Sequence, residues 1–206
     1  MTRQFRCASI VAAALLESVG AADAHIIASR LGDFYAGALH PLSDLQDLIP
    51  WIALGVLAGS LGPAKGRWLV LVFPLGLLIG LALGLSFGGV SAGPVADAGM
   101  IVVLGLLLAA EMGIPAAFLC TIALGLALMR GVANAGGVGP ETNRLLFAAG
   151  LAVAGYAAIT LTMALTLVFR RADAEPTIAW RAIAIRAFGS WIAAIGLMMG
   201  GVALSS

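Results

Sequence analysis

The chain has 206 residues and a formal net charge of +1; hydrophobic residues make up 62% of it and charged residues only 10%. Soluble domains carry about a quarter charged residues, so this composition excludes an ordinary soluble domain and predicts an integral membrane protein. A near-neutral chain lacks the excess of basic residues that is typical of nucleic-acid-binding proteins, so we expect no nucleic-acid partner. The two cysteines, Cys7 and Cys120, lie in different apolar segments, which excludes a disulfide framework.

The first 24 residues have the three parts of a secretory signal peptide. Two arginines precede an apolar stretch at residues 7–16, and residues 22–24 read Ala-Asp-Ala, a cleavage pattern. We expect cleavage there, with an uncleaved anchor helix as the alternative. Cleavage would leave His25 as the mature N-terminus, whose amine and imidazole nitrogen form a chelating pair for nickel or copper.

Five long apolar stretches and one shorter one follow the signal, and the longest reach the length of about 20 residues that a helix needs to cross a hydrocarbon core of roughly 30 Å. They cover residues 45–61, 68–87, 99–110, 115–129, 145–169 and 187–204. The short alternating segments of a transmembrane barrel do not occur in the sequence. The pattern predicts an all-α membrane bundle of about six transmembrane helices in a single domain, residues 25–206.

Basic residues orient these spans, because loops that stay in the cytoplasm are enriched in Lys and Arg. With the mature N- and C-termini outside, six basic residues fall inside and three outside. The inner ones are Lys65, Arg67, Arg170, Arg171, Arg181 and Arg186, and the outer ones are Arg30, Arg130 and Arg144. We therefore expect a multi-pass protein with both mature ends outside.

Glycines recur every fourth residue along several spans. They are Gly76, Gly80, Gly84 and Gly88 in the second span, Gly55 and Gly59 in the first, and Gly196 and Gly200 in the sixth. Small residues at this spacing let helices approach closely in lipid. We interpret them as packing faces, and the same faces could also support a homo-oligomer.

The densest polar cluster precedes and enters the first span. His40, Asp44 and Asp47 have i, i+4, i+7 spacing, which places them on one face of a continuous helix. One imidazole and two carboxylates suit a divalent nickel, cobalt, zinc or manganese ion, and Pro50 frees a backbone carbonyl nearby. In the alternative, Pro41 occupies the first helical position, His40 is a cap residue and Asp44 favours the positive end of the helix dipole.

Other polar residues are secondary candidates. Asp97 starts the third span and suits a helix N-terminus, and Glu111 at its other end is expected to be solvated. Arg130 either extends to lipid headgroups or faces the interior beside Asp47, together with Asn134. Cys120 is expected to be a small buried apolar residue. Tryptophans near span ends predict interfacial anchors; they are Trp51, Trp68, Trp180 and Trp191.

Three stretches resemble the HupE/UreJ family of bacterial membrane proteins. They are residues 34–42, Phe-Tyr-Ala-Gly-Ala-Leu-His-Pro-Leu; residues 93–109; and residues 186–189, Arg-Ala-Phe-Gly. The resemblance implies a nickel or cobalt permease of the bacterial inner membrane, associated with hydrogenase, urease or cobalamin systems.

The site motifs of that family are only partly present. His40 and Pro41 match the first-span motif, while Asp44 and Asp47 stand where the family has Gly and His, and Asp97 replaces a Glu. In the fourth-span motif, Arg130 and Asn134 replace both histidines. The site is therefore rich in oxygen and poor in imidazole, which shifts its preference towards harder cations.

Two functions remain open. The first is a divalent-metal permease for nickel or cobalt with His40, Asp44, Asp47, Asn134 and His25 as candidate ligands; the sequence has no GxxxxGK[ST] motif for an ATPase of its own. The second is a non-transporting accessory or scaffold protein for metalloenzyme maturation. We find no nucleophile–base pair and expect no enzyme activity. The expected partners are membrane lipid and the transported divalent ion, with no tightly bound cofactor.

Overall fold

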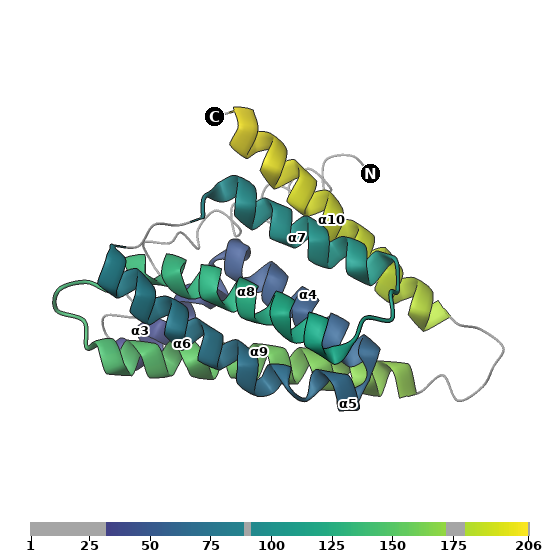
Figure 1. Ribbon diagram of the computed structural model, residues 1–206, viewed down its shortest axis with the longest axis horizontal. Coiled ribbons are helices and arrows are strands. Elements are labelled where there is room, and N and C mark those ends of the chain that lie inside the picture. The colour runs from purple at the N-terminus through teal and green to yellow at the C-terminus, as the bar shows by residue number, and fades with distance from the viewer. Residues whose placement is uncertain (1–31, 89–91, 172–179, 206) are drawn as a thin grey trace, which may run out of the picture.

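The computed structural model describes residues 32–88, 92–171 and 180–205. Within these residues the regular structure is helical and contains no strand, which confirms the all-α prediction (Figure 1). The elements are α3 (Asp33–Ser43), α4 (Leu45–Leu61), α5 (Pro63–Gly66), α6 (Leu69–Phe87), α7 (Pro94–Ala109), α8 (Ala116–Asn134), the 3₁₀ helix η1 (Ala135–Gly137), α9 (Arg144–Arg171) and α10 (Trp180–Ser205). The expected signal peptide and His25 lie outside the described residues.

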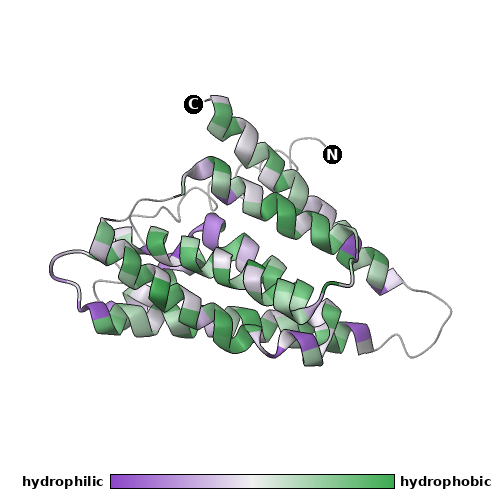
Figure 2. Ribbon diagram, viewed as in Figure 1, coloured by the Kyte–Doolittle hydropathy of each residue, from purple (hydrophilic) through white to green (hydrophobic). Residues whose placement is uncertain are grey.

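Four helical segments of the described chain are long and apolar enough to cross a membrane. They are Pro63–Phe87, Ala116–Gly137, Arg144–Arg170 and Trp180–Ser205. Helices α4 and α7 are also apolar but shorter, with 17 and 16 residues. Figure 2 shows hydrophobic colours over most of the longer helices. The chain is thus a membrane protein, and the expected total of six spans remains a prediction.

Helix α4 lies between two groups of helices. Helices α7 and α10 pack along each other, α6 packs along α8, and α9 contacts α3, α4 and α6. Helix α4 contacts both α7 and α9, and so joins the α7–α10 pair to the rest (Figure 1). Several of the largest core side chains are completely buried, including Trp51 of α4 and Phe73 of α6.

The position of α4 explains why Trp51 is not an interfacial anchor. Its ring is fully buried and meets Phe73 edge-on, with 5.4 Å between ring centroids. The prediction was wrong because it used distance from the span end and ignored which side of the helix faces the core. Trp68, Trp180 and Trp191 are at least half exposed, as expected for anchors.

Helices α3 and α4 form one helix interrupted at a single residue. Asp44 separates them and has an extended backbone, with φ −97° and ψ 117°. Gly37 of α3 lies against Phe147, and Gly55 of α4 lies against Thr162 further along α9. Both segments therefore pack against α9.

This interruption corrects both interpretations of the polar cluster. His40 and Asp47 lie in different helices with Asp44 between them, so the three do not share one continuous helix face. Pro41 lies inside α3 and does not begin a helix, so His40 is not its cap. Asp44 itself is the N-cap of α4, which agrees with the dipole part of the alternative.

The glycines in the middle of the spans pack helices together. Gly76, Gly80 and Gly84 lie so close to α8 and η1 that an added Cβ would overlap their atoms. Another face of α6 exposes Leu71, Leu75, Ile79 and Leu83. Gly55 and Gly59 pack against α9, and Gly196 against α7. The packing prediction is confirmed except at Gly88, which ends α6 in a left-handed conformation.

Four helices, α7 to α10, extend beyond the expected apolar spans, and the extensions of α8 and α7 concern the polar residues. Helix α8 continues five residues past residue 129, so Arg130 and Asn134 are helical although they lie beyond the expected span. Helix α7 begins at Pro94 instead of residue 99, because proline suits a first helical turn. Both extensions hold polar residues inside the bundle.

Candidate functional site

A buried arginine is the centre of the main polar cluster. Arg130 is 3% exposed, and its guanidinium contacts three carboxylates. Nε donates to Oδ1 of Asp47 at 2.6 Å, Nη2 donates to Oδ2 of Asp44 at 3.0 Å, and Nη1 lies 3.2 Å from Oδ2 of Asp97. One side chain of α8 therefore joins α4, the α3–α4 interruption and α7.

Asn134 completes the hydrogen bonding of Asp47 from one helical turn further along α8. Its Nδ2 donates to Oδ2 of Asp47 at 2.9 Å and to the backbone oxygen of Arg130 at 2.8 Å. The Oδ1 of Asn134 is buried and has no hydrogen-bond partner within the described chain. A buried acceptor in this condition is costly, so it is available to a donor or a cation.

Local sequence places each carboxylate at the start of a helix. Asp44 caps α4, and its Oδ1 accepts from the backbone N–H of Gln46 at 2.9 Å. Asp47 and Asp97 lie in the first turns of α4 and α7. The positive end of the helix dipole favours carboxylates at these positions.

The exposure of the carboxylates differs sharply. Asp47 and Asp97 are 1% and 7% exposed, whereas the Asp44 side chain is 41% exposed. Asp44 therefore connects an otherwise buried cluster with the surface at the helix interruption.

The cluster carries more negative than positive charge. With every group ionised, the carboxylates of Asp44, Asp47 and Asp97 contribute three negative charges and Arg130 one positive charge. Buried charges are expensive unless they are paired. The remaining two negative charges could be balanced by one divalent cation or by two protons.

His40 lies near this cluster in the sequence, and its ring packs between α9 and η1. The ring centroid is 6.3 Å from that of Phe147, and its edge lies against Gly137. Within the described residues, no group of three or more His, Cys, Asp or Glu could hold a metal ion. The structure thus brings three predicted ligands, Asp44, Asp47 and Asn134, together around a guanidinium.

Two members of the cluster were only secondary candidates in the sequence. The expectation that Arg130 extends to headgroups was wrong, because its guanidinium is buried among acids; the alternative position beside Asp47 is confirmed. Asp97 is an Arg130 partner as well as a helix-start residue. The signal that could have found both is an arginine in an apolar helix, which requires acidic partners.

Glu111 lies away from this cluster. It pairs with Arg170 at 3.5 Å, and its side chain is 40% exposed, so the expectation of a solvated position holds in part. Cys120 is partly buried against the core, in line with its expected apolar role.

The family model described as HupE / UreJ protein matches residues 13–199. The chain belongs to the HupE/UreJ family. No curated protein and no solved structure matches it. In this HupE/UreJ protein, Arg130 and Asn134, the positions at which the family resemblance expects histidines, both contact Asp47. Two separated sequence motifs therefore meet at one buried site.

Proposed function

We propose that this HupE/UreJ protein moves a divalent transition-metal cation, of the nickel or cobalt kind, across the bacterial inner membrane. It would act as a permease without its own ATPase. The observation that carries the proposal is the convergence of three carboxylates, two of them buried, on one guanidinium, which leaves a net charge of −2 when every group is ionised. A divalent cation balances that charge.

The interrupted helix supplies an entrance. Discontinuous helices in transporters commonly line ion and substrate sites. Asp44 lies at the interruption and is partly exposed, whereas Asp47, three residues further, is buried. A cation that reaches Asp44 can pass to Asp47 and to the free Oδ1 of Asn134.

Arg130 acts in this proposal as a resting counter-cation. Its guanidinium donates to the same Asp44 and Asp47 oxygens that a metal ion would use. Each entering ion must therefore displace it. The membrane potential contributes about 2.3 kcal/mol per charge per 100 mV to inward movement, which would assist this displacement.

Uptake of labelled nickel, cobalt and manganese by intact cells tests the proposal. We expect wild type to accumulate at least one of these metals and Asp47→Asn to lose most of that uptake. Glu141→Gln is a matched control, because Glu141 is an exposed acid in the loop after η1 and belongs to no ion pair of the described chain. Equal uptake by wild type, Asp47→Asn and vector-only cells would reject the proposal.

The expected chelating role of His25 requires a separate test. Mass spectrometry of the mature chain should show His25 as the first residue. A chain that retains residues 1–24 would exclude the terminal amine from metal binding.

One observation favours the second function, a non-transporting accessory or scaffold protein for metalloenzyme maturation. Arg130 already bridges three acids, and such a network could serve only to hold α4, α7 and α8 together. Purified protein in liposomes separates the two functions. Metal uptake by the protein alone supports the permease, whereas recovery of a stoichiometric partner in mild detergent without liposome uptake supports the scaffold.

A further inference from the structure

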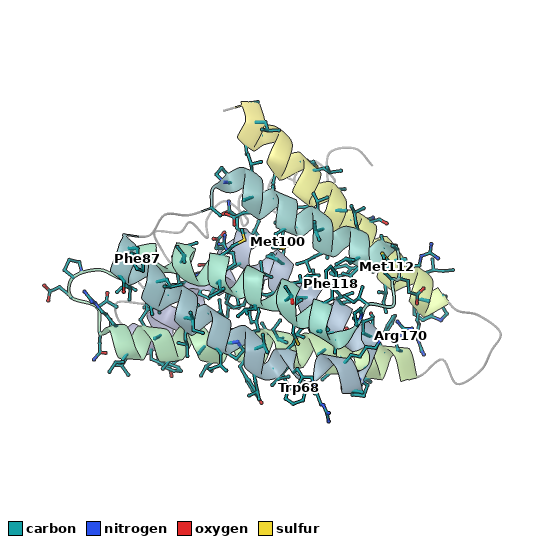
Figure 3. The ribbon with its side chains drawn as sticks, viewed as in Figure 1. Trp68, Phe87, Met100, Met112, Phe118 and Arg170 are labelled. Carbon is teal, nitrogen blue, oxygen red and sulfur yellow. The ribbon has the colours of Figure 1, made fainter. Side chains whose placement is uncertain are left out.

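Two adjoining cavities lie at the end of the bundle opposite the Arg130 cluster. One has a volume of about 380 Å³ and is lined from α4, α5, α7, α9, α10 and the α7–α8 connection. The other is an apolar groove of about 430 Å³ among α4, α9 and α10. Ile185 lines both, so the two cavities adjoin at this residue. Figure 3 shows Met112 and Arg170, which line the first cavity, near one end of the molecule and Phe87 towards the other.

The first cavity is suited to an anion. Lys65 and Arg170 line it together with a single acid, Glu111. The Nζ of Lys65 uses one proton to donate to the backbone oxygen of Ile114 at 3.1 Å, which leaves two more. The Arg170–Glu111 contact is long, at 3.5 Å, so the guanidinium retains donors for another acceptor.

An unpaired hydroxyl strengthens this interpretation. Ser60 lines the same cavity, and its Oγ is buried with no hydrogen-bond partner in the part of the chain that the structure describes. A hydroxyl beside two cationic groups matches a phosphate, which has several strong acceptor oxygens and a negative charge.

The second cavity is suited to a hydrocarbon chain. Its walls are Val56, Leu165, Thr166, Phe169, Ala184, Ile185 and Phe188. The Thr166 hydroxyl already donates to the backbone oxygen of Thr162 at 2.7 Å, so the groove offers little to a polar ligand. Arg181 lies over the Phe169 ring at 5.5 Å and adds positive charge beside the groove.

We propose that an anionic phospholipid binds here, with its phosphate beside Lys65, Arg170 and Ser60 and one acyl chain along the groove past Ile185. Charge selects the headgroup, because two cations face one carboxylate. A zwitterionic headgroup would bring its own cation to this basic end and bind more weakly. The site is independent of the proposed transport function, since it contains no member of the Arg130 cluster.

Native mass spectrometry and thermal unfolding of the purified full chain in neutral detergent test the proposal. Phosphatidylglycerol and phosphatidylcholine with identical acyl chains are added separately. We expect one retained phosphatidylglycerol and a higher Tm, and neither with phosphatidylcholine. Lys65→Gln/Arg170→Gln should weaken phosphatidylglycerol binding about tenfold or more, because charge-assisted hydrogen bonds to phosphate are lost.

Arg67→Gln is the matched control. Arg67 is a basic residue of the same end, stacked over Trp68 at 5.2 Å, and lines neither cavity. Its loss should leave phosphatidylglycerol binding unchanged. The Tm of each variant without lipid shows whether the fold is retained, and a double variant that does not fold is replaced by the single change Arg170→Gln.

The acyl-chain part is tested by filling the groove. Ala184→Leu should reduce phosphatidylglycerol binding without changing the cationic residues. Inorganic phosphate alone should not reproduce the rise in Tm. An equal rise would show that the site binds a free anion, and would overturn the proposal of a lipid ligand. Equal retention of both lipids, or an equal loss of binding in Arg67→Gln and the double variant, would overturn the proposal.

Discussion

Replacement of Arg130 by methionine isolates the contribution of the buried guanidinium, because methionine keeps much of the length of the side chain without its charge. The variant leaves Asp47 and Asp97, which are 1% and 7% exposed, without their shared cation. Removing one partner of a buried ion pair costs about 3–5 kcal/mol. We expect Arg130→Met to lower the free energy of unfolding by roughly this amount.

The Asp44 contact should contribute much less. Its side chain is 41% exposed, and solvent-exposed ion pairs are typically worth about 0–1 kcal/mol. Asp44→Asn should therefore cost at most about 1 kcal/mol, since asparagine also remains a good helix cap. We therefore expect the buried contacts of Arg130 to contribute much more to the free energy of unfolding than its contact with Asp44.

Unfolding by sodium dodecyl sulfate in mixed micelles, followed by tryptophan fluorescence, measures both variants. Trp51 is fully buried and packs on Phe73, so its emission should report loss of the core. The reasoning would be refuted by a neutral Arg130→Met, or by equal destabilisation of Arg130→Met and Asp44→Asn.

The same titration checks three smaller predictions. Asp44→Ala should be about 1 kcal/mol less stable than Asp44→Asn, because alanine cannot cap α4; equal stability would mean that the cap contributes nothing. Gly80→Ala should cost about 1–3 kcal/mol through overlap with α8, whereas Gly125→Ala, with nothing within 4 Å, should be neutral or slightly stabilising; similar losses at both would contradict the packing argument. Glu111 has φ 50°, so Glu111→Gly should retain stability or gain up to about 1 kcal/mol; a clear loss would show that its ion pair outweighs the backbone strain.

Hydropathy located most helices because it depends on each segment's own residues. The expected span 45–61 coincides with α4, and the expected span 68–87 differs from α6 by one residue. Glycine spacing likewise identified the packed face of α6. A helix in lipid satisfies its own backbone hydrogen bonds, so its position requires little information from the rest of the chain.

The helix interruption at Asp44 was not evident from residue spacing. The spacing of His40, Asp44 and Asp47 fits one face of a continuous helix as well as it fits two helices separated at Asp44. In the structure, the Asp44 backbone is extended while its side chain both caps α4 and pairs with Arg130. A residue 86 positions away in the chain thus helps to fix a local conformation.

By itself the sequence determined that the chain is a helical membrane protein, where most of its apolar helices lie and which family it resembles. Only the tertiary structure decided which charges meet. Arg130 and Asp47 are 83 residues apart and come within 2.6 Å because α4 and α8 pack in the same bundle. Apolar length is a local property, whereas the partner of a buried charge is set by the packing of helices that are distant in the chain.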